Sequence, residues 1–501
     1  MENRPEWGSR AGFILAAIGS AVGLGNIWRF PAVAYENGGG AFFIPYLFAL
    51  ITAGIPLLIL EFTMGHKFRG SAPLTFAKMN KKTEWIGWWQ LAISFVISTY
   101  YAVIVAWALS YSFFSMKQSW GKDKEDFLFN EYLKLTVDAG QTGSIVPGVF
   151  IPLLIVWIIV LGILIKGIKK GIEKVNRVFL PLLVILFSII VIRAVTLPGA
   201  MTGLNAFFEP KWDKILDGSV WIAAYGQIFF SLSVGFAIML TYASYLPKKG
   251  DITNNAFITG FANSSFELLA GIGVFSVLGF MAVQQGVEVS DVVTGGVGLA
   301  FVVFPSIINE LPAFNGFFGF LFFASLFLAG ITSLMSILET YVAGIQDKFK
   351  VKRRAAVLLG GGLSALISIL YATQGGLQFL NVVDAFINNY GVVLAGLMEV
   401  VVVGWVLNSL NDFKDHANRL SDIRLGSWWS ISLRYITPWV LTFMMIKTVI
   451  KDVSDPYGGY PTEFIAIYGW GVAAIVLVVG FLLSTKKWDT NSLDIHNKEV
   501  S

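Results

Sequence analysis

The chain has no cysteine, very little histidine and few charges. Of its 501 residues none is Cys, 3 are His and 14% are charged. The absence of cysteine excludes disulfides and thiolate metal sites. The three histidines, His66, His416 and His496, are scattered and form no nucleophile–base set or metal cluster, so we do not expect an enzyme. Polar stretches such as 117–145 are too short for a soluble domain.

Long apolar runs dominate the composition instead. Hydrophobic residues make up 55% of the chain, and runs of the roughly 20 residues that cross a bilayer recur along nearly all of it. No cleavable signal peptide is expected, because Arg29 and Pro31 follow the first run without a cleavage-site pattern. The sequence predicts an all-α integral membrane protein with twelve transmembrane helices. Their expected ranges are 11–35, 40–65, 86–115, 146–165, 171–194, 219–246, 252–284, 314–345, 355–371, 376–407, 427–450 and 463–484.

Basic residues predict the orientation, because Lys and Arg accumulate on the cytoplasmic side. Such clusters follow the even-numbered runs, at 66–69, 166–170, 248–249, 348–354, 414–424 and 486–487. The segment 285–313 on the opposite side carries Glu288, Asp291 and Glu310 without any Lys or Arg. We therefore expect both termini in the cytoplasm and the chain in a cell (plasma) membrane, which in a bacterium is the inner membrane.

The first apolar run is interrupted near its middle by Ala21–Gly25, which Asn26 and Arg29 follow. In lipid, a broken helix is tolerated only where it is buried in protein or lines a polar cavity. Its free carbonyls can bind a cation, and the free N–H groups of the second half-helix can bind a carboxylate. This interruption is the first candidate binding site.

A matching interruption lies in the sixth run, at Ser231–Gly235. Paired broken helices in corresponding positions indicate an inverted-repeat transporter whose site lies at the bilayer midplane. An alternative is that Gly and Ser here only let helices pack closely. A channel could also use oxygen-lined breaks, but a channel filter normally assembles around a symmetry axis.

Several segments of the chain resemble the neurotransmitter:sodium symporter family, the solute carrier 6 type. They are Gly19–Pro31, Glu36–Phe42, Gly54–Glu61, Trp221–Gly235 and Ala329–Ser333. The resemblance covers about residues 4–484 and is closest to bacterial amino-acid members. It implies inverted five-helix repeats with broken helices 1 and 6. The expected division is a cytoplasmic N-terminal segment 1–10, repeat 1 at 11–195, repeat 2 at 196–408, helices 11–12 at 409–484 and a cytoplasmic tail 485–501.

Two sodium sites follow from the residues and the resemblance together. A hard cation prefers neutral or anionic oxygens, and Asn26, Ser231 and Asn263 offer them. The resemblance implies that the first sodium binds these three side chains and the Ala21 carbonyl. For the second sodium it implies the carbonyls of Gly19, Val22 and Ala329 and the hydroxyls of Thr332 and Ser333. Alternatively, both hydroxyls simply bond within their own helix.

Glu267 stands where chloride-dependent members of the family have Ser. A carboxylate there supplies the negative charge itself, so the resemblance implies chloride independence, with Tyr46 and Gln227 beside the carboxylate. We further hypothesise that Glu267 binds a proton once sodium has left and carries it back. An ionisable residue within the membrane is a functional candidate by default, although a structural role is the alternative.

The substrate is expected to bring its own carboxylate, because neither break contains an acid and Gly23 stands where monoamine transporters have Asp. The carboxylate would meet the N–H groups of Gly23, Leu24 and Gly25, the Tyr101 hydroxyl and the first sodium. The amino group would meet the carbonyls of Ala21, Phe230 and Ser231 and the Ser233 hydroxyl. The substrate side chain would contact Ser20, Ile97, Phe236, Ser333 and Ile337. Most of these are apolar, so a neutral hydrophobic amino acid is expected.

By resemblance, gates close both sides of this site. Arg29 and Asp384 form the outer pair, and a buried Arg is physically expected to have a carboxylate partner. The inner pair is Arg4 and Asp347, near Trp7 and Tyr245, unless Arg4 only sets the topology. Glu339 departs from the family pattern, and its role stays open.

The sequence thus predicts a sodium-coupled symporter of neutral hydrophobic L-amino acids. Its expected partners are the amino acid and the lipid bilayer, with no nucleic acid, and it is expected to be a monomer or weak homodimer. The alternatives are a sodium-conducting channel and a symporter for another carboxylate-bearing small solute.

Overall fold

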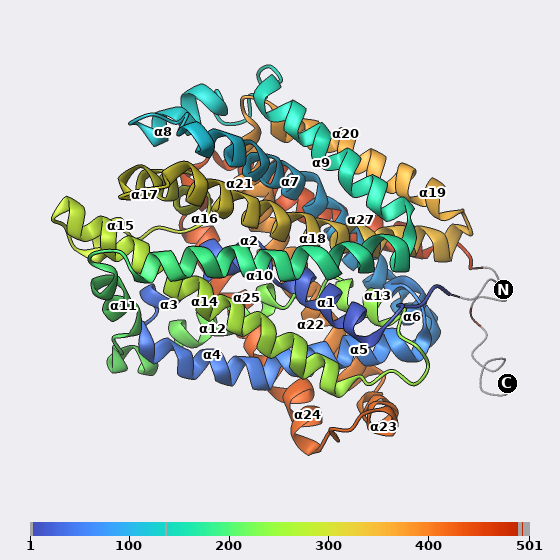
Figure 1. Ribbon diagram of the computed structural model, residues 1–501. Helices are drawn as coiled ribbons and strands as arrows, with labels where there is room; N and C mark the ends of the chain where they lie inside the picture. The colour runs from blue at the N-terminus through green and yellow to red at the C-terminus, as the bar shows by residue number, and fades with distance from the viewer. Residues whose placement is uncertain (1–3, 136–137, 489–492, 494–501) are drawn as a thin grey trace.

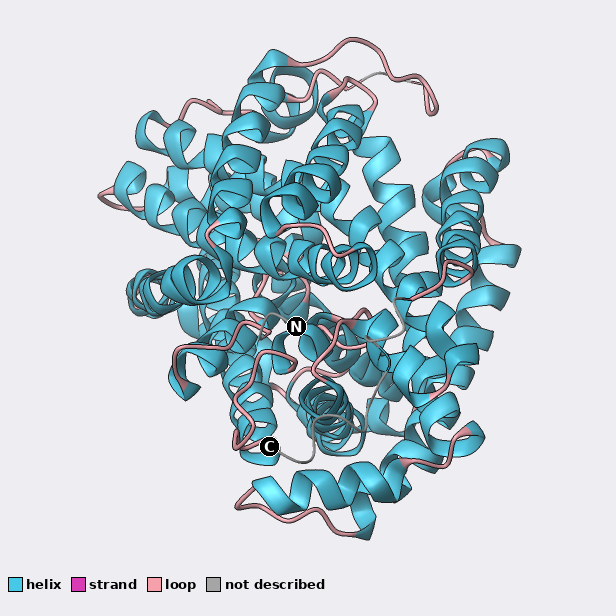
Figure 2. Ribbon diagram, turned by 90° about the vertical axis from the view of Figure 1, so that its right-hand side faces the viewer, coloured by secondary structure: helices cyan, strands magenta, loops and turns pink. Residues whose placement is uncertain are grey.

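The computed structural model describes residues 4–135, 138–488 and 493. Within these ranges the chain forms helices and no strand, apart from the isolated bridges Gly39–Pro210 and Ile145–Thr373. Figure 2 shows helices joined directly by loops and turns. The prediction of an all-α protein is confirmed.

Among the described residues, ten helical segments are long and apolar enough to cross a membrane. They are Gly40–Phe68, Lys81–Lys117, Pro147–Ile165, Ile168–Val195, Thr253–Gln285, Asn315–Phe349, Arg353–Ala372, Gly376–Val406, Ser427–Gly459 and Thr462–Ser484. These segments coincide with ten of the predicted runs. The largest difference is the end at Gly459, because the charges from Lys447 onward end the apolar run without ending the helix.

Regular α-helices make up most of each span (Figure 1). They are α4 (Phe43–Ala49), α5 (Ile55–Phe68), α7 (Glu84–Lys117), α9 (Pro147–Ile165), α10 (Lys174–Val195), α14 (Thr253–Gln285), α18 (Asn315–Phe349), α19 (Arg353–Ala356), α20 (Gly362–Ser368), α21 (Gly376–Phe386), α22 (Val393–Val401), α24 (Ser427–Ile431), α25 (Thr437–Ser454), α26 (Thr462–Ile465) and α27 (Val472–Ser484). Short 3-10 or π-helical turns complete the spans, at η1 (Gly40–Phe42), η2 (Leu50–Gly54), η3 (Lys81–Thr83), η5 (Ile168–Glu173), η8 (Val357–Gly361), η9 (Ile369–Ala372), η10 (Ile387–Val392), η11 (Val402–Val406), η12 (Ser432–Ile436), η13 (Tyr457–Gly459) and η14 (Ala466–Gly471).

Two further spans are interrupted, as predicted. The first consists of α1 (Arg10–Ala21), α2 (Leu24–Trp28) and α3 (Phe30–Glu36), and it bends by 53° after Ala21. The second consists of α12 (Gly218–Ser231) and α13 (Ile238–Ala243). The bent first span brings the number of candidate spans to 11, and a count of twelve depends on taking α12 and α13 as one more.

The centre of the bundle is formed by α7 and α18, which pack against each other. The most apolar stretches of these two spans are 78% and 89% buried, whereas those of the spans containing α9, α10 and α27 are 33%, 28% and 22% buried. The latter helices expose many apolar side chains, as is expected of a surface that faces lipid. The residues of the two breaks, Ala21–Leu24 and Ser231–Gly235, are buried in the protein, which satisfies the condition for a broken helix in a membrane.

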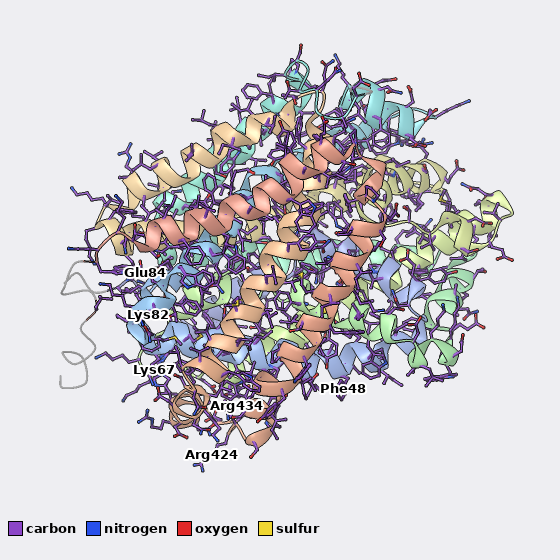
Figure 3. All side chains as sticks on the ribbon, turned by 180° about the vertical axis from the view of Figure 1, so that it is seen from behind. Phe48, Lys67, Lys82, Glu84, Arg424 and Arg434 are labelled. Carbon is purple, nitrogen blue, oxygen red and sulfur yellow. The ribbon has the colours of Figure 1, made fainter. Side chains whose placement is uncertain are left out.

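Shorter helices lie at the two ends of the bundle. Towards the right of Figure 1, the predicted cytoplasmic end, are α6 (Ala72–Met79) and α23 (Leu410–Leu420). At the opposite end are α8 (Lys124–Asp126), η4 (Phe127–Tyr132), α11 (Ala200–Phe208), η6 (Trp212–Leu216), α15 (Val289–Val292), α16 (Gly296–Gly298), η7 (Leu299–Val303) and α17 (Phe304–Glu310). Figure 3 shows the basic side chains of Lys67 and Lys82 at the first of these ends.

Candidate functional site

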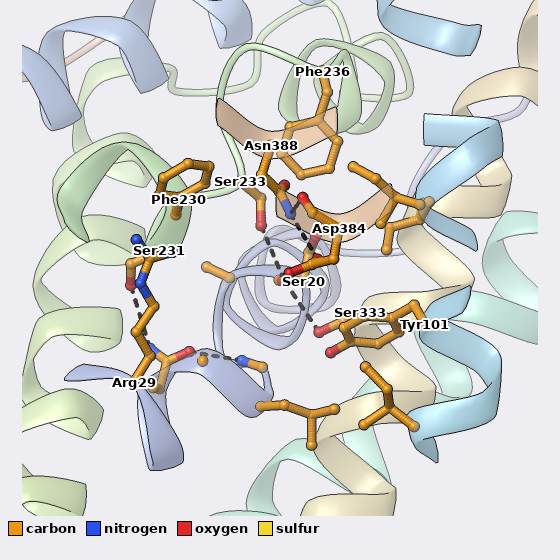
Figure 4. Close-up of a pocket in the computed structure, with 18 of the residues that line it drawn as sticks. Ser20, Arg29, Tyr101, Phe230, Ser231, Ser233, Phe236, Ser333, Asp384 and Asn388 are labelled. Carbon is orange, nitrogen blue, oxygen red and sulfur yellow. Dashed lines mark hydrogen bonds between the residues drawn. The ribbon is translucent and has the colours of Figure 1, made fainter. Parts of the chain in front are cut away.

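A cavity of about 230 Å³ lies between the two helix breaks (Figure 4). Helix α7 contributes Ile97 and Tyr101, and α18 contributes Ser333 and Ile337. The structure brings every residue predicted to contact the substrate to this one cavity. They are Ser20, Ala21, Gly23, Leu24, Gly25, Ile97, Tyr101, Phe230, Ser231, Ser233, Phe236, Ser333 and Ile337.

The first break gives the cavity a wall of backbone. A Cβ built on Gly23 would lie 3.1 Å from Ser333 Oγ and 3.3 Å from the Tyr101 hydroxyl oxygen, so a side chain has little room there. A Cβ on Gly25 would meet no atom within 4 Å. Space for a ligand therefore exists beside the start of α2, where the N–H groups are free of intrahelical partners.

The second break is held by a buried carboxylate that the sequence analysis did not single out. Ser233, Gly235 and Ala237 have φ values of 55°, 88° and 69°. Glu61, which is fully buried, accepts from the N–H of Gly235 at 2.7 Å and from that of Leu240 at 3.2 Å. Its carboxylate thus satisfies backbone donors that the interrupted helix leaves without carbonyl partners.

Three serines connect the two breaks to α18 across the cavity. The hydroxyls of Ser233 and Ser333 both donate to the Ser20 carbonyl oxygen, at 3.2 and 3.3 Å (Figure 4). The Ser20 hydroxyl oxygen is buried and has no hydrogen-bond partner within the described ranges. A buried hydroxyl without a partner is costly, and a polar group of a bound solute would relieve that cost.

The side chains predicted for the first sodium form one buried cluster. The Asn26 amide donates to Asn263 Oδ1 at 2.8 Å and to Ser231 Oγ at 3.4 Å, and the Asn263 amide donates to Ser231 Oγ at 2.5 Å. Asn26 Oδ1 accepts from the Gly23 N–H at 2.8 Å. Three polar side chains from α2, α12 and α14 therefore meet, and two of them, Asn26 and Ser231, line the cavity. Amide and hydroxyl oxygens are among the ligands that a hard cation prefers.

The residues predicted for the second sodium lie where α1 meets α18. Gly19 faces Thr332, since a Cβ on Gly19 would lie 3.5 Å from Thr332 Cβ. The Thr332 hydroxyl donates to the carbonyls of Leu328 and Ala329, at 3.2 and 3.0 Å. For Thr332 this is the bonding within its own helix that is the alternative to a sodium ligand. A donating hydroxyl keeps its acceptor lone pairs, so this bonding is compatible with a cation ligand as well.

Asn176 of α10 is a neighbour of this region that sequence reasoning missed. Its side chain is fully buried, and its Oδ1 lies 2.4 Å from a Cβ built on Gly19. The same oxygen has no hydrogen-bond partner in the part of the chain that the structure describes. The sequence offered little signal, because Asn176 stands among the charged residues Glu173, Lys174 and Arg177 at the start of its span.

Glu267 lies in a pocket of hydrogen-bond donors beside the first sodium cluster. The Tyr46 hydroxyl donates to one carboxylate oxygen, and the Gln227 side-chain amide donates to the other at 2.6 Å. The carboxylate is fully buried and has no basic partner within ion-pairing distance among the described residues. Donors of this kind stabilise a negative charge.

The two residues of the predicted outer gate line the same cavity without pairing directly. The Arg29 guanidinium lies over the Phe230 ring, 4.5 Å from its centroid. Asp384 accepts instead from the Asn388 amide at 2.7 Å. Within the described ranges Arg29 makes no ion pair at 4.0 Å or less, so the outer gate in this structure is a cation–π contact.

The two residues of the predicted inner gate, by contrast, form an ion pair. Arg4 donates to both oxygens of Asp347 at 2.9 Å, and Asp347 also accepts from the Ser71 N–H at 2.7 Å. Burial is the largest single influence and would lower the pKa of Arg4, but Asp347, Tyr245 and Glu339 together outweigh it, so the pKa lies above its ordinary value. The Trp7 indole donates to the Tyr242 carbonyl at 2.8 Å, and Arg4 lies over the Tyr245 ring at 4.9 Å.

Glu339, whose role the sequence left open, extends this gate. It is fully buried and accepts from Arg353 through both oxygens, at 3.0 and 2.6 Å. The Tyr245 hydroxyl donates to it at 2.7 Å. A bidentate arginine is the partner that a buried carboxylate needs, and it ties α19 to the inner gate.

The model of the sodium:neurotransmitter symporter family matches residues 4–126 and 121–490. The chain belongs to this family. An uncharacterized sodium-dependent transporter of Methanocaldococcus jannaschii is 40% identical over 484 residues, covering 97% of this chain and 98% of the relative. The sodium- and chloride-dependent glycine transporter 2 of Xenopus laevis is 30% identical over 542 residues, covering 95% of this chain and 68% of the relative. The family is one of sodium-dependent membrane transporters.

Proposed function

We propose that this member of the family is a symporter that couples sodium entry to the uptake of neutral, hydrophobic L-amino acids. The observation that carries the proposal is the cavity between the two helix breaks, which Asn26 and Ser231 line and behind which Asn263 hydrogen-bonds to both. Its volume of about 230 Å³ suits a small solute, being below the range of roughly 300–1,000 Å³ that is typical of drug-sized ligands.

Sodium and substrate binding would be coupled because the substrate carboxylate would contribute an oxygen to the shell of the first sodium. A substrate carboxylate in the open space beside Gly25 would meet the N–H groups at the start of α2 and lie next to the amide cluster. It would then complete the shell of the first sodium and receive that ion's charge in return. Each ligand would then raise the affinity for the other by the same factor, which couples the two binding events.

The preference for a hydrophobic side chain rests on Ile97, Phe236 and Ile337, which line the cavity. The unpartnered Ser20 hydroxyl adds a polar contact within it. Tyr101 and Ser333 crowd Gly23, so an acid at that position, suited to a free amine, has no room in this arrangement. These contacts favour an amino acid over a monoamine.

We further propose that transport needs no chloride. Glu267 supplies a negative charge where Tyr46 and Gln227 would otherwise hold an anion beside the sodium cluster. Once sodium leaves, a fully buried carboxylate with no basic partner favours its neutral form, so Glu267 would take up a proton and return it across the membrane. The Xenopus relative, by contrast, is a sodium- and chloride-dependent transporter.

Alternating access would use the two gates in turn, with both termini in the cytoplasm. In this structure the inner network around Arg4 and Asp347 is closed, whereas Arg29 and Asp384 are not paired. We infer that closing the outer gate brings Arg29 from Phe230 to Asp384, and that opening the inner gate breaks the Arg4–Asp347 pair. The proposed mechanism therefore exchanges one ion pair for the other.

Replacement of Glu267 by Ser tests the chloride proposal. The wild-type protein in proteoliposomes should take up leucine equally well with chloride or gluconate outside, whereas Glu267→Ser should need chloride. The variant Glu267→Gln keeps the bulk and loses the charge, so it should transport slowly in both media. Uptake by Glu267→Ser that ignores chloride, in a variant that still binds sodium, would contradict the proposed role.

A further inference from the structure

A second and larger cavity opens at the predicted cytoplasmic end, where the turn from α9 to α10 meets the N-terminal segment. Its volume is about 960 Å³, against about 230 Å³ for the solute cavity. It plays no part in the site described above. Its charged lining consists of Lys166, Lys169, Lys170, Lys174, Arg177 and Glu173.

Positive charge is concentrated in this cavity without matching negative charge. Five cationic side chains and one carboxylate line it. The carboxylate, Glu173, is already engaged: it accepts from Arg177 at 2.7 Å, from the Gly8 N–H at 2.6 Å and from the Ser9 hydroxyl at 3.2 Å. Within the described ranges no ion pair engages the four lysines, so their mutual repulsion is uncompensated.

Local backbone geometry is what makes the lysines converge. Gly167 has φ 83°, which turns the chain sharply after α9, and the π-helical turn Ile168–Glu173 follows. The N-terminal segment closes the other side, since a Cβ built on Gly8 would lie only 2.8 Å from Lys169 Cε. The cations therefore border a concave space and are not simply spread along a helix face.

The remaining lining is apolar and continues into the lipid-facing surface. Ile163, Val175, Val178 and Phe179 form it, and the side chain of Val178 is 56% exposed. The apolar stretches of the α9 and α10 spans are among the least buried of the molecule. A ligand in this cavity would thus have its polar part among the cations and its apolar part against the apolar lining, beside the surface expected to face lipid chains.

We propose that this cavity binds the phosphate-bearing headgroup of an anionic lipid. Lysine ammonium groups bind phosphate as point charges, and anionic headgroups are abundant at the cytoplasmic surface that these residues are predicted to face. Inorganic phosphate would neither fill the space nor use the apolar lining. The bound headgroup neutralises the lysines and stabilises the turn whose Glu173 binds Gly8 and Ser9. Arg4 and Trp7 of the predicted inner gate lie just before Gly8 in the chain, so the headgroup stabilises them as well.

The test is direct binding of lipid to the delipidated full-length protein in detergent. Dioleoylphosphatidylglycerol, followed by native mass spectrometry, should bind saturably, and dioleoylphosphatidylcholine should bind far more weakly. The triple variant Lys169→Gln/Lys170→Gln/Lys174→Gln should lose roughly a hundredfold in affinity, from the usual contribution of a basic residue near an anionic surface. The matched triple Lys81→Gln/Lys248→Gln/Lys249→Gln removes as much charge from the same end outside the cavity and should bind like wild type.

Two further arms separate the remaining explanations. The triple variant Lys169→Arg/Lys170→Arg/Lys174→Arg keeps the charge and should retain binding, which distinguishes lost charge from lost folding. Inorganic phosphate in excess should not displace the lipid; complete displacement would identify free phosphate as the occupant and overturn the assignment. Equal losses in the cavity triple and the matched triple would overturn it as well, since binding would then depend only on net charge.

Discussion

Replacing Arg353 with glutamine should destabilise the inner gate more than replacing its partner Glu339. Arg353 donates to both oxygens of Glu339 and, at 2.6 Å, to the Leu164 carbonyl. Glu339 has no exposed surface, whereas the Arg353 side chain is 18% exposed. In the variant Arg353→Gln the Glu339 carboxylate stays buried without its cation. Among the described residues, only the Tyr245 hydroxyl still donates to it.

The size of the effect follows from the burial of the pair. Removing one partner of a buried ion pair costs about 3–5 kcal/mol. With an unfolding entropy of about 2.1 cal/mol/K per residue, the midpoint of a chain of 501 residues falls by about 3–5 °C. Glu339→Gln removes the charge that needs the partner, and its amide oxygen still accepts from Tyr245, so the midpoint should fall by less than half as much.

The assay is thermal unfolding of the purified protein, followed by tryptophan fluorescence, on both single variants and the double variant. Arg353→Gln/Glu339→Gln should be more stable than Arg353→Gln alone, because no buried charge is left unpaired. Arg354→Gln, at an exposed neighbour, is the matched control and should leave the midpoint unchanged. A double variant as unstable as the two single effects added together would refute the pairing argument.

Two other predictions concern the cavity and the predicted cytoplasmic surface. Gly23→Ala should weaken substrate binding roughly ten- to hundredfold in an equilibrium assay with labelled leucine, because the added methyl meets Ser333 and Tyr101; Gly362→Ala, where the space is open, should bind normally. His416 shares a 3.0 Å hydrogen bond with His66, and burial lowers its pKa from 6.5 to about 4. Protonation is therefore resisted in the packed state, so the docking of α23 should be unimpaired above about pH 6.5 and weaken as the pH falls towards 4. Hydrogen exchange in Leu410–Leu420, corrected for its intrinsic pH dependence, should rise over that window; a flat profile, or the same rise in His416→Gln, would contradict the prediction.

The sequence was sufficient to predict the spans and much of the cavity, for one physical reason. In an apolar run every polar side chain needs a partner, so Asn26, Ser231 and Asn263 were conspicuous although they lie far apart along the chain. The structure brings them within hydrogen-bond distance. Helix ends were predictable within a few residues where an apolar run ends abruptly at charged residues.

Other contacts depended on packing that no sequence pattern reveals. Arg353 lies in the basic stretch 348–354, which reads as an orientation signal, and its bond to Glu339 shows only in three dimensions. The approach of Asn176 to Gly19 follows from how closely α10 packs on α1. The separation of Arg29 and Asp384 reflects which gate is closed, a property of one conformation and not of the sequence.

The central claim, sodium-coupled uptake of a hydrophobic amino acid, is tested most directly in proteoliposomes with an imposed inward sodium gradient. We predict saturable accumulation of labelled leucine above equilibrium, abolished when sodium is equal on both sides and reduced by unlabelled hydrophobic amino acids. Loss of accumulation in Asn26→Ala and Asn263→Ala would connect it to the polar cluster at the cavity. Sodium current without any solute, or leucine uptake that is indifferent to the sodium gradient, would contradict the account.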